Sequence, residues 1–272
     1  MRTTKNLKIS NKISAIIETP SNKNSPTPLV IFFHGFGTQK NEFGNLFKII
    51  SEYLLKNSIA SLRINFNGYS SDGYFSPNLS IHSLLDDANE TISYASTLNN
   101  ISTIGICGFS LGAGIALLAT NRNTSANVKS IALLSPSGDL VDDFAKSHTN
   151  QCFLEMKEHS GPYHINMRWK KAYIYREFLE SLNCYNIKNE IKKNHLPMLL
   201  IAGSEDYTAE HVDYFYNHAL STYKHKKIIY NANHIFNDHK KNISYIPNVA
   251  ETTKKWFENT LYLRIENDKN SN

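Results

Sequence analysis

The sequence predicts an α/β protein whose mostly parallel central sheet carries helices on both faces. Two patterns indicate this fold class. Short continuous apolar runs, typical of strands buried on both faces, alternate along the chain with segments of helical periodicity. Strands and helices that alternate in this way form right-handed βαβ units around a parallel sheet. The 272 residues contain no internal repeat and no low-complexity linker, so we expect a single domain over residues 1–272.

The expected elements alternate from the first strands to the last helix. Weak alternation over residues 7–19 predicts one or two outer strands. Continuous apolar runs predict buried strands near residues 29–33, 58–66, 104–109, 128–134, 198–202 and 227–230. Helical periodicity predicts helices near residues 46–54, 81–98, 113–119, 210–220 and 246–263, the second of them capped by Ser80. Residues 266–272 form a polar tail, which we expect to be frayed.

Residues 139–195 interrupt this alternation. The segment is aromatic and polar and has no clear strand pattern, so we expect a short helical lid inserted into the domain. Tyr163, Trp169, Tyr173 and Tyr175 cluster within it. They either line a substrate cleft or only pack the insertion onto the sheet. Tyr163, Trp169 and Tyr173 are therefore the candidate substrate-binding residues.

Composition narrows the functional class. Lys and Arg are interspersed with Asp and Glu and the formal net charge is +5, which disfavours a nucleic-acid-binding surface. Cys107, Cys152 and Cys184 lack the spacing of a zinc site or a redox pair, so we expect free thiols in a reducing compartment. Residues 1–12 lack the apolar core of a signal peptide, and no apolar run reaches the roughly 18 residues of a membrane span. We expect a cytoplasmic protein without nucleic-acid or membrane partners.

A Gly-x-Ser-x-Gly motif at Gly108–Gly112 marks the junction of one predicted strand and helix. A strand, a sharp turn carrying a serine and a helix together form a nucleophile elbow. The elbow requires the two glycines because its helix passes so close to the strand that a Cβ atom would not fit. Patterns of five residues also occur by chance in glycine-rich turns of other α/β proteins, so the motif requires support from the rest of the chain.

That support comes from polar residues that follow other predicted strands. His34, Ser110, Asp206 and His234 each come directly after an apolar run, and ligands bind at the carboxyl ends of parallel strands. A serine hydroxyl is a poor nucleophile unless a base lies within hydrogen-bond reach, and a carboxylate must hold that base in one tautomer. The chain order Ser110, Asp206, His234 suits this triad. Glu205 competes with Asp206 for the acid position, and we expect His34 to be structural.

Short sequence blocks over residues 29–260 carry a family resemblance. They are His34-Gly35-Phe36-Gly37 with Lys40-Asn41-Glu42, Asn65-Phe66-Asn67-Gly68 with Ser71-Asp72-Gly73, Asp86-Asp87-Ala88-Asn89, the elbow, Gly203-Ser204-Glu205-Asp206, and Asn233-His234-Ile235-Phe236. Together they resemble the α/β-hydrolase-fold serine hydrolases, in the esterase and acyl-hydrolase branch that includes the bacterial cinnamoyl (feruloyl) esterases.

The resemblance implies a role for each matching residue. Ser110 would be the nucleophile, His234 the general base and then the general acid, and Asp206 the carboxylate that orients His234. The backbone N–H groups of Phe36 and Leu111 would form the oxyanion hole. Leu111 stands where the cinnamoyl esterases often carry a polar residue.

The expected activity is hydrolysis of a carboxylic ester of a small or medium acyl substrate, through an acyl-enzyme intermediate and without a metal or cofactor. An acyl thioesterase would use the same machinery. A catalytically silent binding protein on the same scaffold is the alternative from another class, because fold alone does not guarantee activity. The presence of all three triad residue types argues against it.

Overall fold

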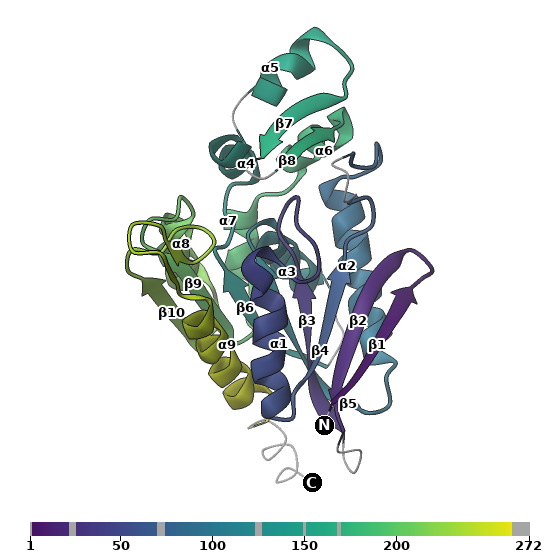
Figure 1. Ribbon diagram of the computed structural model, residues 1–272, viewed down its shortest axis with the longest axis vertical. Helices are drawn as coiled ribbons and strands as arrows, with labels where there is room; N and C mark the ends of the chain where they lie inside the picture. The colour runs from purple at the N-terminus through teal and green to yellow at the C-terminus, as the bar shows by residue number, and fades with distance from the viewer. Residues whose placement is uncertain are drawn as a thin grey trace.

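An eight-stranded sheet runs through the centre of the molecule, in the order β1-β2-β4-β3-β5-β6-β9-β10 (Figure 1). The computed structural model describes residues 2–21, 26–69, 74–122, 127–148, 151–167 and 170–262. The strands of this sheet are β1 (Arg2–Ile9), β2 (Ile13–Pro20), β3 (Thr27–Phe33), β4 (Ala60–Asn65), β5 (Ile101–Phe109), β6 (Val128–Leu134), β9 (Met198–Gly203) and β10 (Lys224–Ile229). The strands from β4 to β10 are parallel, and β1 and β2 add an antiparallel edge. The predicted mostly parallel sheet is confirmed.

Helices cover both faces of the sheet, as predicted. The helices α1 (Leu46–Lys56) and α9 (Ile246–Leu261) lie on one face, and α2 (Ile81–Ser96), α3 (Leu111–Arg122) and α8 (Ala209–His218) lie on the other. Successive strand residues point to opposite faces, so Phe32 packs in the core beside α1 and α9 while Phe33 packs in the core beside α2 and α3. This explains why the strand sequences are continuously apolar.

Local signals set the element ends close to where the sequence places them. Ser80 caps α2: its hydroxyl accepts from the Ser83 N–H at 3.1 Å, and the Ser83 hydroxyl accepts from the Ser80 N–H at 2.9 Å.

The expected frayed tail at 266–272 lies outside the described residues. None of the helices within the described ranges is long and apolar enough to cross a membrane.

The insertion at 139–195, here called the lid, differs from the expected helical structure. It contains α4 (Leu140–His148), α5 (Gln151–Glu158), the strands β7 (Tyr163–Met167) and β8 (Lys170–Ile174), α6 (Arg176–Ser181), η2 (Leu182–Cys184), α7 (Ile187–Glu190) and η3 (Ile191–Lys193). β7 and β8 pair as an antiparallel hairpin below α5, at the top of Figure 1. The sequence pattern missed this hairpin because each strand has only five residues over which alternation can be seen.

The shorter elements lie around the end of the sheet nearest the lid. They are η1 (Phe43–Asn45), which precedes α1, and the two-residue strands β11 (Asn237–Asp238) and β12 (Ile243–Ser244), which precede α9. β11 and β12 pair with each other.

Helix α3 approaches the sheet at backbone contact distance. A Cβ atom on Gly112 would overlap the Phe33 carbonyl oxygen and lie 2.5 Å from that of His34. Gly114 lies two residues further along the helix. A Cβ atom there would meet only the side chains of Ile187 and Leu140, at 3.5 and 3.6 Å. The first glycine is therefore required by packing, whereas the second is not.

These two glycines make a matched pair of variants. We expect Gly112→Ala to lower the free energy of unfolding by at least about 2 kcal/mol, because the new methyl group would have to displace backbone. Gly114→Ala should leave stability unchanged or raise it by up to about 1 kcal/mol, since alanine favours the helix. Urea denaturation measures both. Equal stability of the two variants would contradict the close approach of α3.

Candidate active site

Ser110 lies at the turn between β5 and α3, with a left-handed backbone conformation (φ 54°). Non-glycine residues adopt this region at an energetic cost, and such strain is concentrated at functional sites. Hydrogen bonds fix the turn: the Ser110 N–H donates to the Leu134 carbonyl at 2.9 Å, and the Ser110 carbonyl accepts from the Ala113 N–H at 3.0 Å. The strand, the strained turn and the helix form the elbow geometry that the motif predicts.

Asp206, His234 and Ser110 form a continuous chain of hydrogen bonds. His234 Nε2 lies 3.0 Å from Ser110 Oγ, and His234 Nδ1 lies 2.8 Å from Asp206 Oδ1. Asp206 follows β9 and His234 follows β10, so parallel strands bring three residues that are far apart in sequence to one edge of the sheet. The Asp206 side chain is fully buried, and the His234 side chain is 22% exposed.

The Asp206 carboxylate fixes the tautomer of His234. Burial by itself would raise the pKa of Asp206, but His234 and the Thr208 N–H, which donates to Oδ1 at 2.9 Å, lower it overall. An ionised Asp206 accepts the proton-bearing Nδ1–H of His234. Nε2 is then left without a proton and faces the Ser110 hydroxyl as an acceptor.

Glu205, the competing acid, lies elsewhere. Its side chain is 47% exposed and its carboxylate is 3.5 Å from Lys240 Nζ, at the rim of the cavity. Of the two acids, Asp206 is the one that contacts His234.

The turn that carries Phe36 passes directly beside Ser110. A Cβ atom on Gly35 would lie 3.3 Å from the Cβ of Ser110, and Phe36 and Leu111 both line the cavity in front of the serine. The two residues expected to supply the oxyanion hole thus both lie next to Ser110 at the cavity.

Glu42 stabilises this turn through hydrogen bonds, a role that the sequence did not predict. Its Oε2 accepts from the Gly35 N–H at 2.7 Å and from the Thr38 hydroxyl at 2.8 Å, and its Oε1 accepts from the Phe43 N–H at 2.9 Å. Burial raises the pKa of Glu42 to about 7, and these three hydrogen bonds limit the rise. The only signal in the sequence is an acidic residue shortly after the His34-Gly35 turn.

His34 is buried beneath the same turn, consistent with the expected structural role. The Phe66 N–H donates to its Nε2 at 3.1 Å, so the ring proton is on Nδ1, which donates to the Gly35 carbonyl at 2.8 Å. Burial lowers the pKa of His34 to about 4. The ring is therefore neutral at physiological pH and makes no contact that would let it act as a second base.

A cavity of about 410 Å³ opens in front of Ser110, between the end of the sheet and the lid. Its apolar wall is formed by Phe36, Phe43, Phe109, Leu111, Leu140, Phe144, Met167, Leu182 and Ile235. Four of these, Leu140, Phe144, Met167 and Leu182, come from the lid. Polar residues, including Ser110, Tyr207 and His234, also line the cavity, and an apolar wall combined with polar groups is typical of small-molecule sites.

The lid tyrosines proposed from the sequence do not line this cavity. Tyr163 is fully buried inside the lid, and its hydroxyl donates to the His159 carbonyl at 2.9 Å. Tyr173 stacks on Tyr74 with ring centroids 4.6 Å apart. The substrate-binding prediction is therefore corrected for both residues, since Tyr163 packs inside the lid and Tyr173 packs the lid against Tyr74. Trp169 lies outside the described residues.

Tyr207 is a second residue that the sequence reasoning missed. It follows Asp206 directly, lines the cavity, and places its hydroxyl 3.3 Å from His234 Nε2. Its ring stacks on the imidazole with centroids 4.6 Å apart.

The strand order, the elbow at Ser110 and the lid over the carboxyl ends of the strands define an α/β hydrolase. The family of the chain is also established. The sequence model of the family described as serine aminopeptidase, S33, matches residues 24–177, more than half of the chain, and the chain belongs to this family. The matched segment includes Ser110 and ends before Asp206 and His234.

Solved structures of low sequence identity share the whole fold. Est1E from Butyrivibrio proteoclasticus superposes with a TM-score of 0.73 at 18% identity, covering 94% of this chain and 98% of that chain, and it has also been solved with ferulic acid bound. Dienelactone hydrolase from Anabaena variabilis has a TM-score of 0.62 at 16% identity, over 96% of this chain and 98% of that chain. The α/β hydrolase domain-containing protein 10 from mouse gives 0.68 at 16% identity, over 94% and 99%. A comparison with curated protein sequences gave no significant match.

The lowered pKa of His34 makes a prediction about stability and pH. A histidine whose pKa falls from 6.5 to about 4 on folding contributes stability above pH 6.5 that is lost as the pH falls toward 4, because the unfolded chain binds the proton first. This group alone should cost the native protein about 2 kcal/mol between pH 8 and pH 5. In His34→Asn that part of the loss should vanish, as measured by urea unfolding at both pH values.

The exposed residue His225 provides the control. His225→Asn should keep the full pH dependence of the parent protein. An unchanged pH dependence in His34→Asn would contradict the assignment of a neutral, buried imidazole under the turn.

Proposed function

We infer that the protein is a serine hydrolase that cleaves carboxylic esters of small or medium acyl groups through an acyl-enzyme intermediate. The observation that carries this proposal is the hydrogen-bonded chain Asp206–His234–Ser110, which ends at the wall of an apolar cavity. A serine paired with a histidine that a carboxylate orients is the arrangement that activates a hydroxyl for acyl transfer.

Acylation uses the groups in the order of the chain. Ser110 Oγ attacks the ester carbonyl carbon while its proton passes to His234 Nε2, and Asp206 stabilises the imidazolium that forms. The carbonyl oxygen gains the negative charge of the tetrahedral intermediate. The backbone N–H groups of Phe36 and Leu111 are proposed to bind that oxygen, and each such donor supplies about 3 kcal/mol of transition-state stabilisation.

Breakdown of the intermediate restores the carbonyl and breaks the bond to the leaving oxygen. The leaving oxygen keeps the electron pair of the broken bond and receives the proton of His234 Nε2, and the alcohol departs. Water then attacks the acyl-enzyme, giving its proton to Nε2, and the second intermediate breaks down as Ser110 Oγ takes that proton back. The products are the carboxylic acid and the free enzyme.

The cavity supports an ester with an apolar acyl group. Phe, Leu, Met and Ile side chains form its apolar wall, and about 410 Å³ suits a medium acyl chain or a single aromatic ring. Est1E, which has the same fold, has been solved with ferulic acid, an acid with a single aromatic ring.

The cavity gives less support to a peptide substrate with a free amino terminus. Recognition of an ammonium group would need a carboxylate that faces the cavity, but of the two acids that line it Asp143 is buried and paired, and Glu205 is 47% exposed at the rim. Asp143 pairs with His211 at 2.9 Å, and Glu205 lies 3.5 Å from Lys240. This supports an ester substrate within a family named for an aminopeptidase.

The proposal predicts that Ser110→Ala abolishes hydrolysis of p-nitrophenyl butyrate, with kcat at least about 10³-fold below the parent, because no other residue replaces the nucleophile. Released nitrophenol measures the rate. The exposed residue Thr222 supplies a control: it precedes β10, at the end of that strand opposite His234, and Thr222→Ala should retain activity.

Parallel assays with acyl thioesters and aminoacyl amides test the substrate class. Faster turnover of esters supports the proposal. Ester turnover retained by Ser110→Ala, or faster turnover of thioesters or amides than of esters by the parent, would overturn it.

A further inference from the structure

The hydroxyl of Tyr207 lies close to His234 Nε2, the atom that accepts and returns every proton in the proposed reaction. Tyr207 Oη is 3.3 Å from His234 Nε2, and the same Nε2 is 3.0 Å from Ser110 Oγ. The tyrosine lines the cavity, so a bound substrate lies beside its hydroxyl. The Tyr207 hydroxyl can therefore contact the reacting groups directly.

The position of Tyr207 is fixed by the turn between β9 and α8. The Asp206 N–H donates to the Gly203 carbonyl at 3.3 Å, and the Ala209 N–H donates to the Asp206 carbonyl at 3.0 Å. Asp206 also accepts from the Thr208 N–H, as described above. The same turn thus directs the carboxylate toward Nδ1 of His234 and the neighbouring tyrosine toward the Nε2 side of the ring.

The hydroxyl keeps its proton throughout the working pH range. Burial raises the pKa of Tyr207 well above its usual range, and the nearby Asp206 and Asp143 carboxylates raise it further, while hydrogen bonds with Ser147 and Ser110 limit the rise. The group is thus a neutral hydrogen-bond donor next to the nucleophile. A neutral donor at this place can stabilise negative charge on an oxygen that approaches Nε2.

The leaving group is the oxygen that must approach Nε2. Once the Ser110 proton has moved to His234, the Nε2–H has to reach the departing oxygen, so that oxygen contacts the same nitrogen from which Tyr207 Oη is 3.3 Å away. We propose that Tyr207 is a catalytic residue that donates a hydrogen bond to the leaving-group oxygen while His234 protonates it. This inference rests on the proposed ester hydrolysis and extends it to the leaving group.

The chemistry of this step is balanced without a change in Tyr207. The carbon–oxygen bond breaks and its electron pair goes to the leaving oxygen, which receives the proton of Nε2. Tyr207 keeps its own proton and contributes only the hydrogen bond. This hydrogen bond strengthens as negative charge develops on the leaving oxygen. Its contribution to the rate therefore depends on how basic that oxygen becomes.

This dependence separates esters by leaving group. An alkoxide from an alkyl ester is strongly basic and needs both the proton and the hydrogen bond. A nitrophenolate delocalises its charge and leaves without much help. Tyr207 therefore suits the protein to esters of ordinary alcohols.

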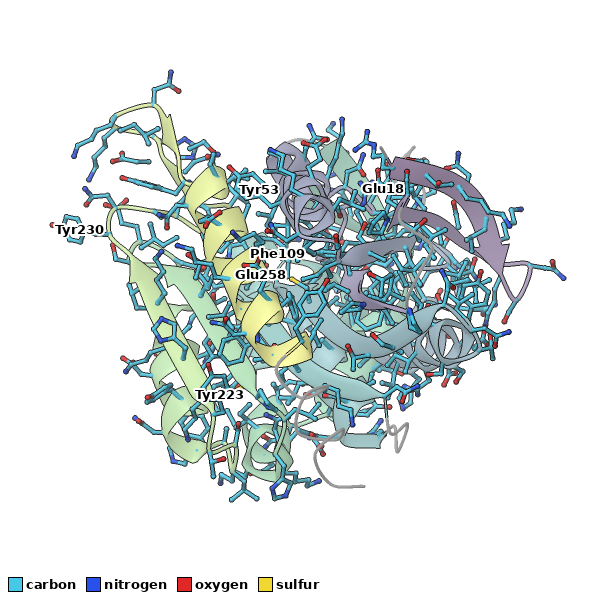
Figure 2. All side chains as sticks on the ribbon, turned by 90° about the horizontal axis from the view of Figure 1, so that it is seen from below. Glu18, Tyr53, Phe109, Tyr223, Tyr230 and Glu258 are labelled. Atoms are coloured by element: carbon cyan, nitrogen blue, oxygen red, sulfur yellow. The ribbon has the colours of Figure 1, made fainter. Side chains whose placement is uncertain are left out.

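The test uses Tyr207→Phe, which removes the hydroxyl and keeps the ring stacked on His234. With butyrate esters of 4-nitrophenol, phenol, ethanol and methanol, kcat/KM should fall roughly 10–100-fold for the alkyl esters, the loss expected for one hydrogen bond to a charged oxygen. For the nitrophenyl ester it should fall less than about threefold, which also shows that the variant is folded. Tyr230→Phe is the control: Tyr230 is 78% exposed and projects from the edge of the molecule (Figure 2), and this variant should match the parent across the series.

The outcomes distinguish the two proposals. A loss that grows with leaving-group basicity supports the inference. An equal loss for all four esters would overturn it, because the tyrosine would then only position His234, and an unchanged series would overturn it as well. If the parent protein hydrolysed none of the four esters, the proposed function itself would be wrong.

Discussion

The close approach of helix α3 to the sheet is the constraint on which the site depends. Glycines at 108 and 112 let backbone meet backbone, since a Cβ atom on Gly108 would lie 2.6 Å from the Cα of Ala113 and one on Gly112 would overlap the Phe33 carbonyl. The chain can then turn from β5 into α3 within a single residue. That residue, Ser110, takes the left-handed conformation that lifts its hydroxyl to the carboxyl ends of the strands. Everything the site needs afterwards is brought to this one place by neighbouring strands.

Two buried polar side chains, His34 and Glu42, stabilise the turn beside Ser110 through hydrogen bonds to its backbone. His34 joins the Phe66 N–H to the Gly35 carbonyl, and Glu42 accepts from the Gly35 N–H. Burying such groups without partners would cost several kcal/mol. Asp143 and His211 form a comparable buried pair between the lid and α8. The result is a pre-organised site, which acyl transfer requires because the developing charge must meet dipoles already in place.

Much of this arrangement could be predicted from the sequence. The strands are continuously apolar, so the residues that follow them, including Ser110, Asp206 and His234, could be assigned to one edge of the sheet. The lid could not be predicted as well, because β7 and β8 are too short to show a pattern, and Tyr163 turned out to be buried inside it. Glu42 and Tyr207 were missed for another reason. Their roles come from where a turn directs a side chain, and no spacing in the sequence encodes that direction.

The most direct test of the account is the rate at which a fluorophosphonate labels the protein, followed by intact mass and by peptide mapping. The account predicts one adduct per chain on Ser110, formed at least about 10²-fold more slowly in Asp206→Asn, because an amide cannot hold His234 in the tautomer that accepts the serine proton. An adduct at another residue, or the same labelling rate in Asp206→Asn, would contradict it.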